Sequence, residues 1–176
     1  MLTDLTEFEQ QVVNAARRGE VAQPATEMTV EELAVTADPG LRVRADLIRE
    51  LLRGLHGDLD PHGIQVVGLR VVGKLDLNYV TTVAGLRLEQ CALPDGIVCR
   101  NAHLRDLHLG RCLLTYLEAD RLHTDGNLFM WEATITGTGK YSAIRLLGAH
   151  IGGQLCLNRA TITCVTGPAL HADELR

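Results

Sequence analysis

The chain has 176 residues, 46% of them hydrophobic but only 3% aromatic, and a formal net charge of −5. This length allows one ordinary core, or a small cap with one elongated body, and excludes two full catalytic domains. A core with so few aromatic residues has to be built from Leu, Val, Ile and Ala, which suits a narrow and repetitive interior.

The acidic charge is concentrated in the first third of the chain. Residues 1–61 contain twelve acidic and six basic side chains, whereas residues 62–176 contain ten and eleven. A nearly neutral C-terminal body suits neither a nucleic-acid-binding surface nor an anionic mimic of one, so we expect no nucleic-acid partner.

Helix signals occupy this N-terminal third. Thr6 and Glu9 form a capping-box pattern that predicts a helix over roughly residues 4–18. Thr29 and Glu32 repeat the pattern, but prolines on both sides keep the second helix short.

The stretch LRVRADLIRELLRGLHG, residues 41–57, carries the clearest helical stripe. Its apolar positions are Val43, Leu47, Ile48, Leu51, Leu52 and Leu55. We interpret it as a core-packing helix, with a partner-binding helix as the alternative, and expect residues 30–55 to cover the first coil of the body. The Gly, Asp and Pro residues of 57–63 predict a boundary between an α-helical cap, residues 1–61, and the body, residues 62–176.

In the body, apolar residues recur every five positions. Within AHLRDLHLGRCLLTYLEADRL, residues 102–122, one apolar column is Ala102, Leu107, Cys112, Leu117 and Leu122, and a second is Leu104, Leu109, Leu114 and Ala119. A period of five fits neither a helix nor a simple strand. It fits a coil of four short extended sides separated by corners, which sends two of every five side chains inward. Longer steps elsewhere, as between Ile64 and Leu75, set the coil at about 20 to 22 residues.

An internal match supports this interpretation. GLRVVGKLDLNYVT, starting at Gly68, aligns without gaps on GAHIGGQLCLNRAT, starting at Gly148, and we interpret the offset between these two glycines as four whole coils. Backbone groups of such coils pair with the coils above and below, about 4.8 Å away. The predicted fold is therefore mainly β, a parallel β-solenoid preceded by a small α-helical cap.

The two apolar columns of residues 102–122 resemble those of the pentapeptide-repeat proteins, whose repeat centres on Leu with a small or apolar residue two positions earlier. This resemblance implies a right-handed quadrilateral β-helix. The family's usual Ala-Asp or Ala-Asn start is mostly absent, so the chain resembles a divergent member. The order of a basic helix, then GIQVVGLRVVGKLDL, then further coils is also similar to that of uncharacterised bacterial proteins with a helical cap on such a solenoid.

His103 and His123 are the candidate metal ligands. Both lie between the inward columns, as His108 does, and the spacing between them matches one coil of about 20 residues, which would stack them on adjacent coils. With Glu118 nearby they would offer three ligands to a divalent metal, and the alternative is a pair of exposed surface histidines. We expect no cofactor and assign no catalytic residue.

The five cysteines form no CxxC pair, and no secretory or membrane-spanning segment is visible, so we expect a reduced, cytoplasmic chain without membrane insertion. Cys91, Cys99 and Cys112 fall in apolar columns and are predicted core fillers. Cys156 lies between two leucines, which predicts an outward-facing thiol that merits a reactivity test. The GTGKYS segment, residues 137–142, lacks the glycine spacing of a P-loop and is predicted to be an outward loop.

A solenoid offers long flat faces, so we expect a non-enzymatic scaffold or protein-protein interaction module. Two alternatives stay open. One is a DNA mimic that modulates a type II topoisomerase, as some pentapeptide-repeat proteins do, and the other is the structural part of a larger enzyme such as an oxidoreductase. The last residues stop where another coil is expected, which predicts either a longer chain or stacking on a second copy as a homodimer.

Overall fold

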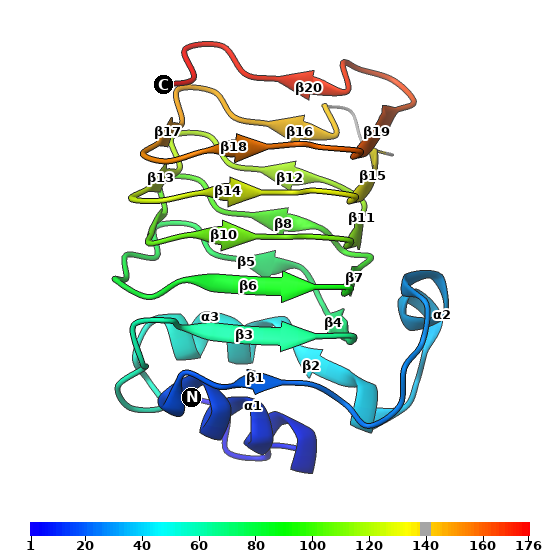
Figure 1. Ribbon diagram of the computed structural model, residues 1–176, viewed down its shortest axis with the longest axis vertical. Helices are drawn as coiled ribbons and strands as arrows, with labels where there is room; N and C mark the ends of the chain where they lie inside the picture. Colours follow the sequence, from blue (N-terminus) through cyan, green and yellow to red (C-terminus); the bar gives the residue numbers. More distant parts are fainter. Residues whose placement is uncertain (138–141) are drawn as a thin grey trace.

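The computed structural model describes residues 1–137 and 142–176. Over these residues the protein is mainly β, and its short parallel strands stack one above another in four sheets, as in a parallel β-solenoid (Figure 1). The helices lie at the N-terminal end, and the coils rise from them toward the C-terminus (Figure 1). Within the described ranges, no helix is both long and apolar enough to cross a membrane.

Each sheet forms one side of the stack, and we name the four sheets A to D. Sheet A contains β1 (Val21–Ala22), β3 (Ile64–Val67), β6 (Leu86–Glu89), β10 (Leu107–His108), β14 (Leu128–Phe129) and β18 (Leu155–Cys156). Sheet B contains β2 (Arg42–Arg44), β4 (Arg70–Val72), β7 (Ala92–Leu93), β11 (Leu113–Leu114), β15 (Thr134–Gly137) and β19 (Thr161–Cys164).

The other two sheets are shorter. Sheet C contains β5 (Leu75–Asp76), β8 (Ile97–Val98), β12 (Leu117–Glu118), β16 (Ile144–Arg145) and β20 (Leu170–His171). Sheet D contains β9 (His103–Leu104), β13 (His123–Thr124) and β17 (His150–Ile151). From β6 onward the chain visits sheets A, B, C and D in turn and then repeats the cycle.

The two predicted apolar columns form the interior of the stack. Every member of both columns in residues 102–122 is at most 1% exposed. They belong to one hydrophobic cluster that continues through the coils above and below. Narrow sides leave room for Leu, Cys and Ala, which is why the core needs almost no aromatic residues.

Coil length follows the prediction in the first coils and departs from it later. Ile64 pairs with Leu86, and Leu86 pairs with Leu107, so each of these coils has a length within the predicted range. Leu117, however, pairs with Ile144, and this coil is several residues longer. The predicted coil length is therefore wrong for this part of the stack.

The chain from β15 to β16 is longer than the corresponding chain from β11 to β12, since β15 ends at residue 137 and β16 begins at residue 144. A corner can lengthen without breaking the pairing of the strands on either side. The predicted outward loop, residues 137–142, falls on this part of the chain, and residues 138–141 of it lie outside the described residues.

The interpretation of the offset between Gly68 and Gly148 as four whole coils is also wrong. Leu75 lies in sheet C, whereas its aligned partner Leu155 lies in sheet A. The two segments match because the corners after sheets A and C share one conformation: Tyr79 and the aligned Arg159 have left-handed φ angles of 59° and 57°. The local sequence pattern therefore repeats every half coil.

Both predicted capping boxes are confirmed. Thr6 and Glu9 cap α1 (Glu7–Arg18), and Thr29 and Glu32 cap α2 (Val30–Val35). A 3-10 turn, η1 (Pro39–Leu41), follows α2.

The third helix, α3 (Ala45–Leu52), is shorter than the stripe of residues 41–57 predicts. Val43 lies instead in β2 and pairs with Val71 of β4, while Leu55 is 40% exposed beyond the helix. The β-branched side chain of Val43 suits this strand, and pairing with β4 outweighs helix continuation.

The N-terminal elements cover the start of the stack in an arrangement that differs from the expected one. α1 packs on β1, β2 and β3, and α3 packs on β2, β3 and β5, whereas α2 lies beside sheet B against β7 and β11 (Figure 1). The prediction that residues 30–55 cover the first coil is therefore right for α3 and wrong for α2. β1 and β2 already belong to the stack, and the domain boundary near residue 61 stays a prediction.

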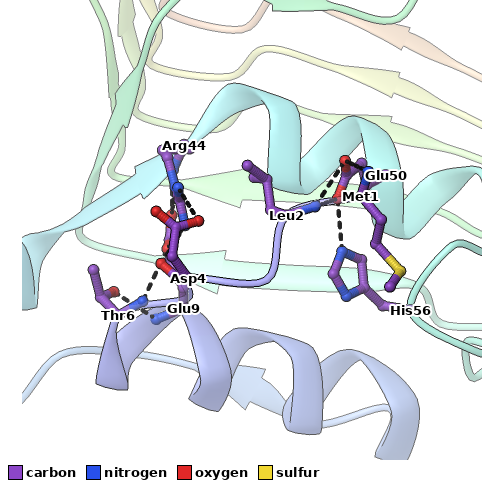
Figure 2. A network of polar contacts seen from close by, with 8 residues as sticks. All are labelled: Met1, Leu2, Asp4, Thr6, Glu9, Arg44, Glu50 and His56. Carbon is purple, nitrogen blue, oxygen red and sulfur yellow. Dashed lines mark hydrogen bonds and ion pairs between the residues drawn. The ribbon is translucent and has the colours of Figure 1, made fainter.

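Two polar clusters attach the N-terminal segment to this base (Figure 2). In the first, the Arg44 guanidinium donates to Glu9, with 2.7 Å between Nη2 and Oε2, and its backbone N–H donates to the same carboxylate over 3.0 Å. Asp4 accepts a further bond from Arg44 over 3.1 Å. These contacts join α1 to the junction between β2 and α3.

The second cluster is centred on Glu50 of α3 (Figure 2). Its carboxylate accepts the backbone N–H of Leu2 over 2.8 Å and lies 2.8 Å from His56 Nε2. The Met1 ammonium is 3.2 Å away. The first residues of the chain are thereby fixed against α3.

Candidate functional site

A column of histidines runs up the outer face of sheet D. His103 of β9 and His123 of β13 are register partners, and their ring centroids are 4.4 Å apart. The prediction that these two residues lie one above the other on adjacent coils, within reach of each other, is confirmed, and their rings meet edge to face at 69°. His150 of β17 continues the column, with its ring centroid 4.8 Å from that of His123.

Asp125 completes a three-residue cluster with the two predicted histidines. Its Oδ1 lies 2.8 Å from His103 Nε2 and 3.4 Å from His123 Nε2. One ligand atom from each of the three residues lies within 4.8 Å of the other two. The cluster thus brings two imidazole nitrogens and one carboxylate oxygen to one point on the surface.

Glu118 does not belong to this cluster, so its predicted role is wrong. It lies in β12 of sheet C and forms an ion pair with Arg100. The sequence could have identified Asp125 as the third residue, because it follows His123 by two positions and alternate residues of an extended segment share a face. His150 was missed because the lengthened coil places it further along the chain than the regular spacing predicts.

The electrostatics of the cluster favour an ionised carboxylate. The hydrogen bond with His103 lowers the pKa of Asp125, and the charges of His103 and His123 act in the same direction. The histidine side chains are each 43% exposed and that of Asp125 is 55% exposed. Water and dissolved ions therefore reach all three groups.

A groove lies beside the cluster, at the N-terminal edge of sheet D. Thr81 pairs with His103 as an isolated parallel bridge, in which the Thr82 N–H donates to His103 O and the His103 N–H donates to Val80 O. In a parallel ladder the N–H and C=O of Thr81 itself then point away from β9. Thr81 lines a groove of about 540 Å³, together with the end of α3 and the segment after it, residues 82–84, His103 and Asp125.

The remaining candidates lie away from this cluster. His108 stacks on Phe129 on the outer face of sheet A, with 4.8 Å between ring centroids, and burial lowers the pKa of its imidazole. It therefore favours the neutral form.

The prediction that Cys91, Cys99 and Cys112 lie in the core is confirmed, since all three are buried. Burial raises the pKa of Cys99 to about 12. Cys156 is partly exposed in β18, and its reactivity stays a prediction. Cys164, which the sequence did not single out, is partly exposed as well.

Comparison with known proteins yields no relative: no family model matches the chain, and neither does any curated protein or solved structure.

Proposed function

We propose that this protein is a non-enzymatic interaction scaffold that binds an extended segment of a partner protein along the N-terminal edge of sheet D. The observation that carries the proposal is the edge at Thr81, a residue that lines the groove and whose own N–H and C=O take no part in the bridge to β9. An unpaired strand edge is a template for another strand, and backbone hydrogen bonds supply much of the affinity when a peptide adds to it.

The other sides of the stack are covered at this end. Sheets A and B extend down to β1 and β2, and α3 packs against β5 at the start of sheet C. On sheet D, among the residues that the structure describes, no strand pairs with Thr81 on the side opposite β9. The groove occupies the position that one more strand would fill.

The groove lining indicates the kind of segment that fits. Val83 projects from the edge with 82% exposure, and an adjoining hollow of about 500 Å³ extends past Thr81 to Tyr79. Asp58 and Asp60 line the groove together with the guanidinium of Arg53. An extended segment with alternating apolar and basic side chains would place its apolar side chains on these apolar contacts and its basic side chains near the two aspartates.

The finer description of the fold belongs to the same proposal. We propose that the coils are divergent pentapeptide repeats wound with a right hand, supported by the central leucines at five-residue spacing and by the four-sheet arrangement. DNA mimicry, a role within a larger enzyme, and stacking of the last coil on a second copy stay as alternative predictions.

A peptide-display selection against the 176-residue chain tests the proposed function. Binders are expected to share alternating apolar and basic residues. Thr81→Pro removes the edge N–H without removing an internal hydrogen bond, and Val83→Arg places a cation and bulk in the groove. Each change is expected to lower the affinity for the selected peptides at least about tenfold. This loss corresponds to about one or two backbone hydrogen bonds.

Val165→Arg is the matched control, because Val165 is 83% exposed and lies away from the groove. Hydrogen exchange adds a direct measure, since a bound peptide should protect the amide of Thr81. Selected peptides that bind all variants equally, or that leave the Thr81 amide unprotected, would contradict the proposal.

A further inference from the structure

Three side chains of the kind that bind metal ions lie close together on sheet D. The two Nε2 atoms of His103 and His123 converge on one Asp125 oxygen, at 2.8 Å and 3.4 Å. His103 and His123 lie on the paired strands β9 and β13, and Asp125 follows His123 by two positions. The backbone pairing of β9 and β13 therefore holds the three donors together. Metal binding would require only side-chain rotation.

The donor set selects the class of ion. Imidazole nitrogens and a carboxylate oxygen suit zinc, copper and nickel, and three protein ligands with an open position are typical of sites that keep a water molecule. Ligand atoms around tetrahedral zinc lie about 3.3 Å apart, as follows from bonds of about 2.0 to 2.1 Å. The distances of 2.8 Å and 3.4 Å from Asp125 Oδ1 to the two Nε2 atoms lie on either side of this value, and no pair of ligand atoms is more than 4.8 Å apart, so no pair has to move by more than about 1.5 Å.

We propose that His103, His123 and Asp125 bind one divalent transition-metal ion, with at least one coordination position open to the adjoining groove. Each histidine then carries its proton on Nδ1 and offers the Nε2 lone pair to the metal. The Asp125 carboxylate neutralises part of the charge of the ion. The open position holds water, or a donor atom of whatever lies in the groove, because His103 and Asp125 are shared between the cluster and the groove lining.

The neighbouring groups provide the internal controls. His150 stacks on His123 but is not part of the three-residue cluster. His171 pairs with Asp173 over 3.0 Å, which gives one imidazole and one carboxylate without a second imidazole. Metal affinity should therefore be unaffected by the loss of His171, and the loss of His150, which contacts His123 without offering a ligand atom to the cluster, should weaken it less than the loss of a ligand.

Metal titration of the whole 176-residue chain tests this site. After chelation and dialysis, Co²⁺ is titrated while its visible d–d absorption is followed, and Zn²⁺ is titrated by calorimetry. One equivalent is expected to bind. His103→Ala, His123→Ala and Asp125→Asn are each expected to weaken binding at least about tenfold, the loss seen when even outer groups of a metal site are removed.

His171→Ala is expected to leave the affinity unchanged, and His150→Ala is expected to weaken it less than any of the three ligand variants. Imidazole nitrogen NMR on the unmodified chain gives a second readout, in which Zn²⁺ should shift the Nε2 resonances of His103 and His123 but not those of His171. The proposal is wrong if the chain binds no metal at one equivalent, if His150→Ala weakens binding as much as His123→Ala does, or if the two Nε2 resonances do not move. Metal binding does not depend on the proposed peptide site, since it is measured without a peptide.

Discussion

Some positions in the stack require glycine, because there is no space for a side chain. Gly63 has a left-handed φ of 74° and lies directly against Gly85, where a Cβ atom would overlap the Gly85 carbonyl oxygen. The same carbonyl accepts the N–H of Ile64 over 3.0 Å, so it cannot move without disturbing the pairing of β3 with β6. Two independent constraints thus require glycine at residue 63.

Gly63→Ala is expected to lower the free energy of unfolding by at least about 3 kcal/mol, because backbone strain adds to a clash with backbone. Gly54→Ala is the matched control, since Gly54 has the same φ of 74° and a Cβ atom there would meet no other atom within 4 Å. It should cost about 1 kcal/mol from strain alone. Urea unfolding measures both values, and equal losses would contradict the argument.

At the scale of elements, two carboxylates attach the N-terminal segment: Glu9 joins α1 to Arg44, and Glu50 of α3 binds the first residues of the chain. Burial raises the pKa of Glu9, but the bonds from Arg44 and Thr6 outweigh it and leave the pKa below its usual value. Burial likewise raises that of Glu50, yet the Leu2 N–H, His56 and the Met1 ammonium bring its pKa to about 2. Glu50 is therefore ionised in the folded protein well into the acidic range, and Glu9 keeps its charge to a lower pH than an ordinary glutamate does.

A lowered pKa in the folded state stabilises the protein above the unfolded-state pKa, near 4.3 for glutamate, and this stability is lost as the pH falls through the folded value. We therefore expect the melting temperature to fall steadily between about pH 4.5 and pH 2. Glu50→Gln should flatten this acid-side fall, whereas Glu20→Gln, at an exposed position, should not. Circular dichroism melts across this range measure the effect, and parallel curves for the two variants would count against it.

For the whole molecule, the interior is a set of apolar columns whose burial depends on the coils above and below. In sheet A, Leu107 is fully buried between Leu86 and Leu128, while Leu155 lies in β18, the last strand of the sheet, and is only partly buried. The same residue type thus meets two levels of packing within one column.

Leu107→Ala is expected to cost about 3 to 4 kcal/mol, because it leaves a cavity between two flanking coils. Leu155→Ala should cost about 1 kcal/mol, because the side chain gives up less buried area. Chemical denaturation of the two variants makes the comparison. Similar losses would show that the column is not packed as described.

The stacked coils, the inward-facing columns and both helix caps could be predicted from local pattern, whereas the length of the later coils could not. The columns of residues 102–122 and the two capping boxes follow from short, fixed spacings along the chain. The helical stripe of residues 41–57 predicted too long a helix, since Val43 fits both the apolar pattern of a helix and that of a strand. Only its pairing with Val71 distinguishes the two.

The sequence by itself determined which side chains face the interior and that His103 and His123 stack, because both depend on short, regular spacings along the chain. The tertiary structure decided the rest of the site. The longer coil places His150 next to His123, Asp125 rather than Glu118 meets the imidazoles, and no strand among the described residues pairs with Thr81 on the side opposite β9. These features depend on which strands become neighbours, and strand register is set by contacts between residues distant in sequence.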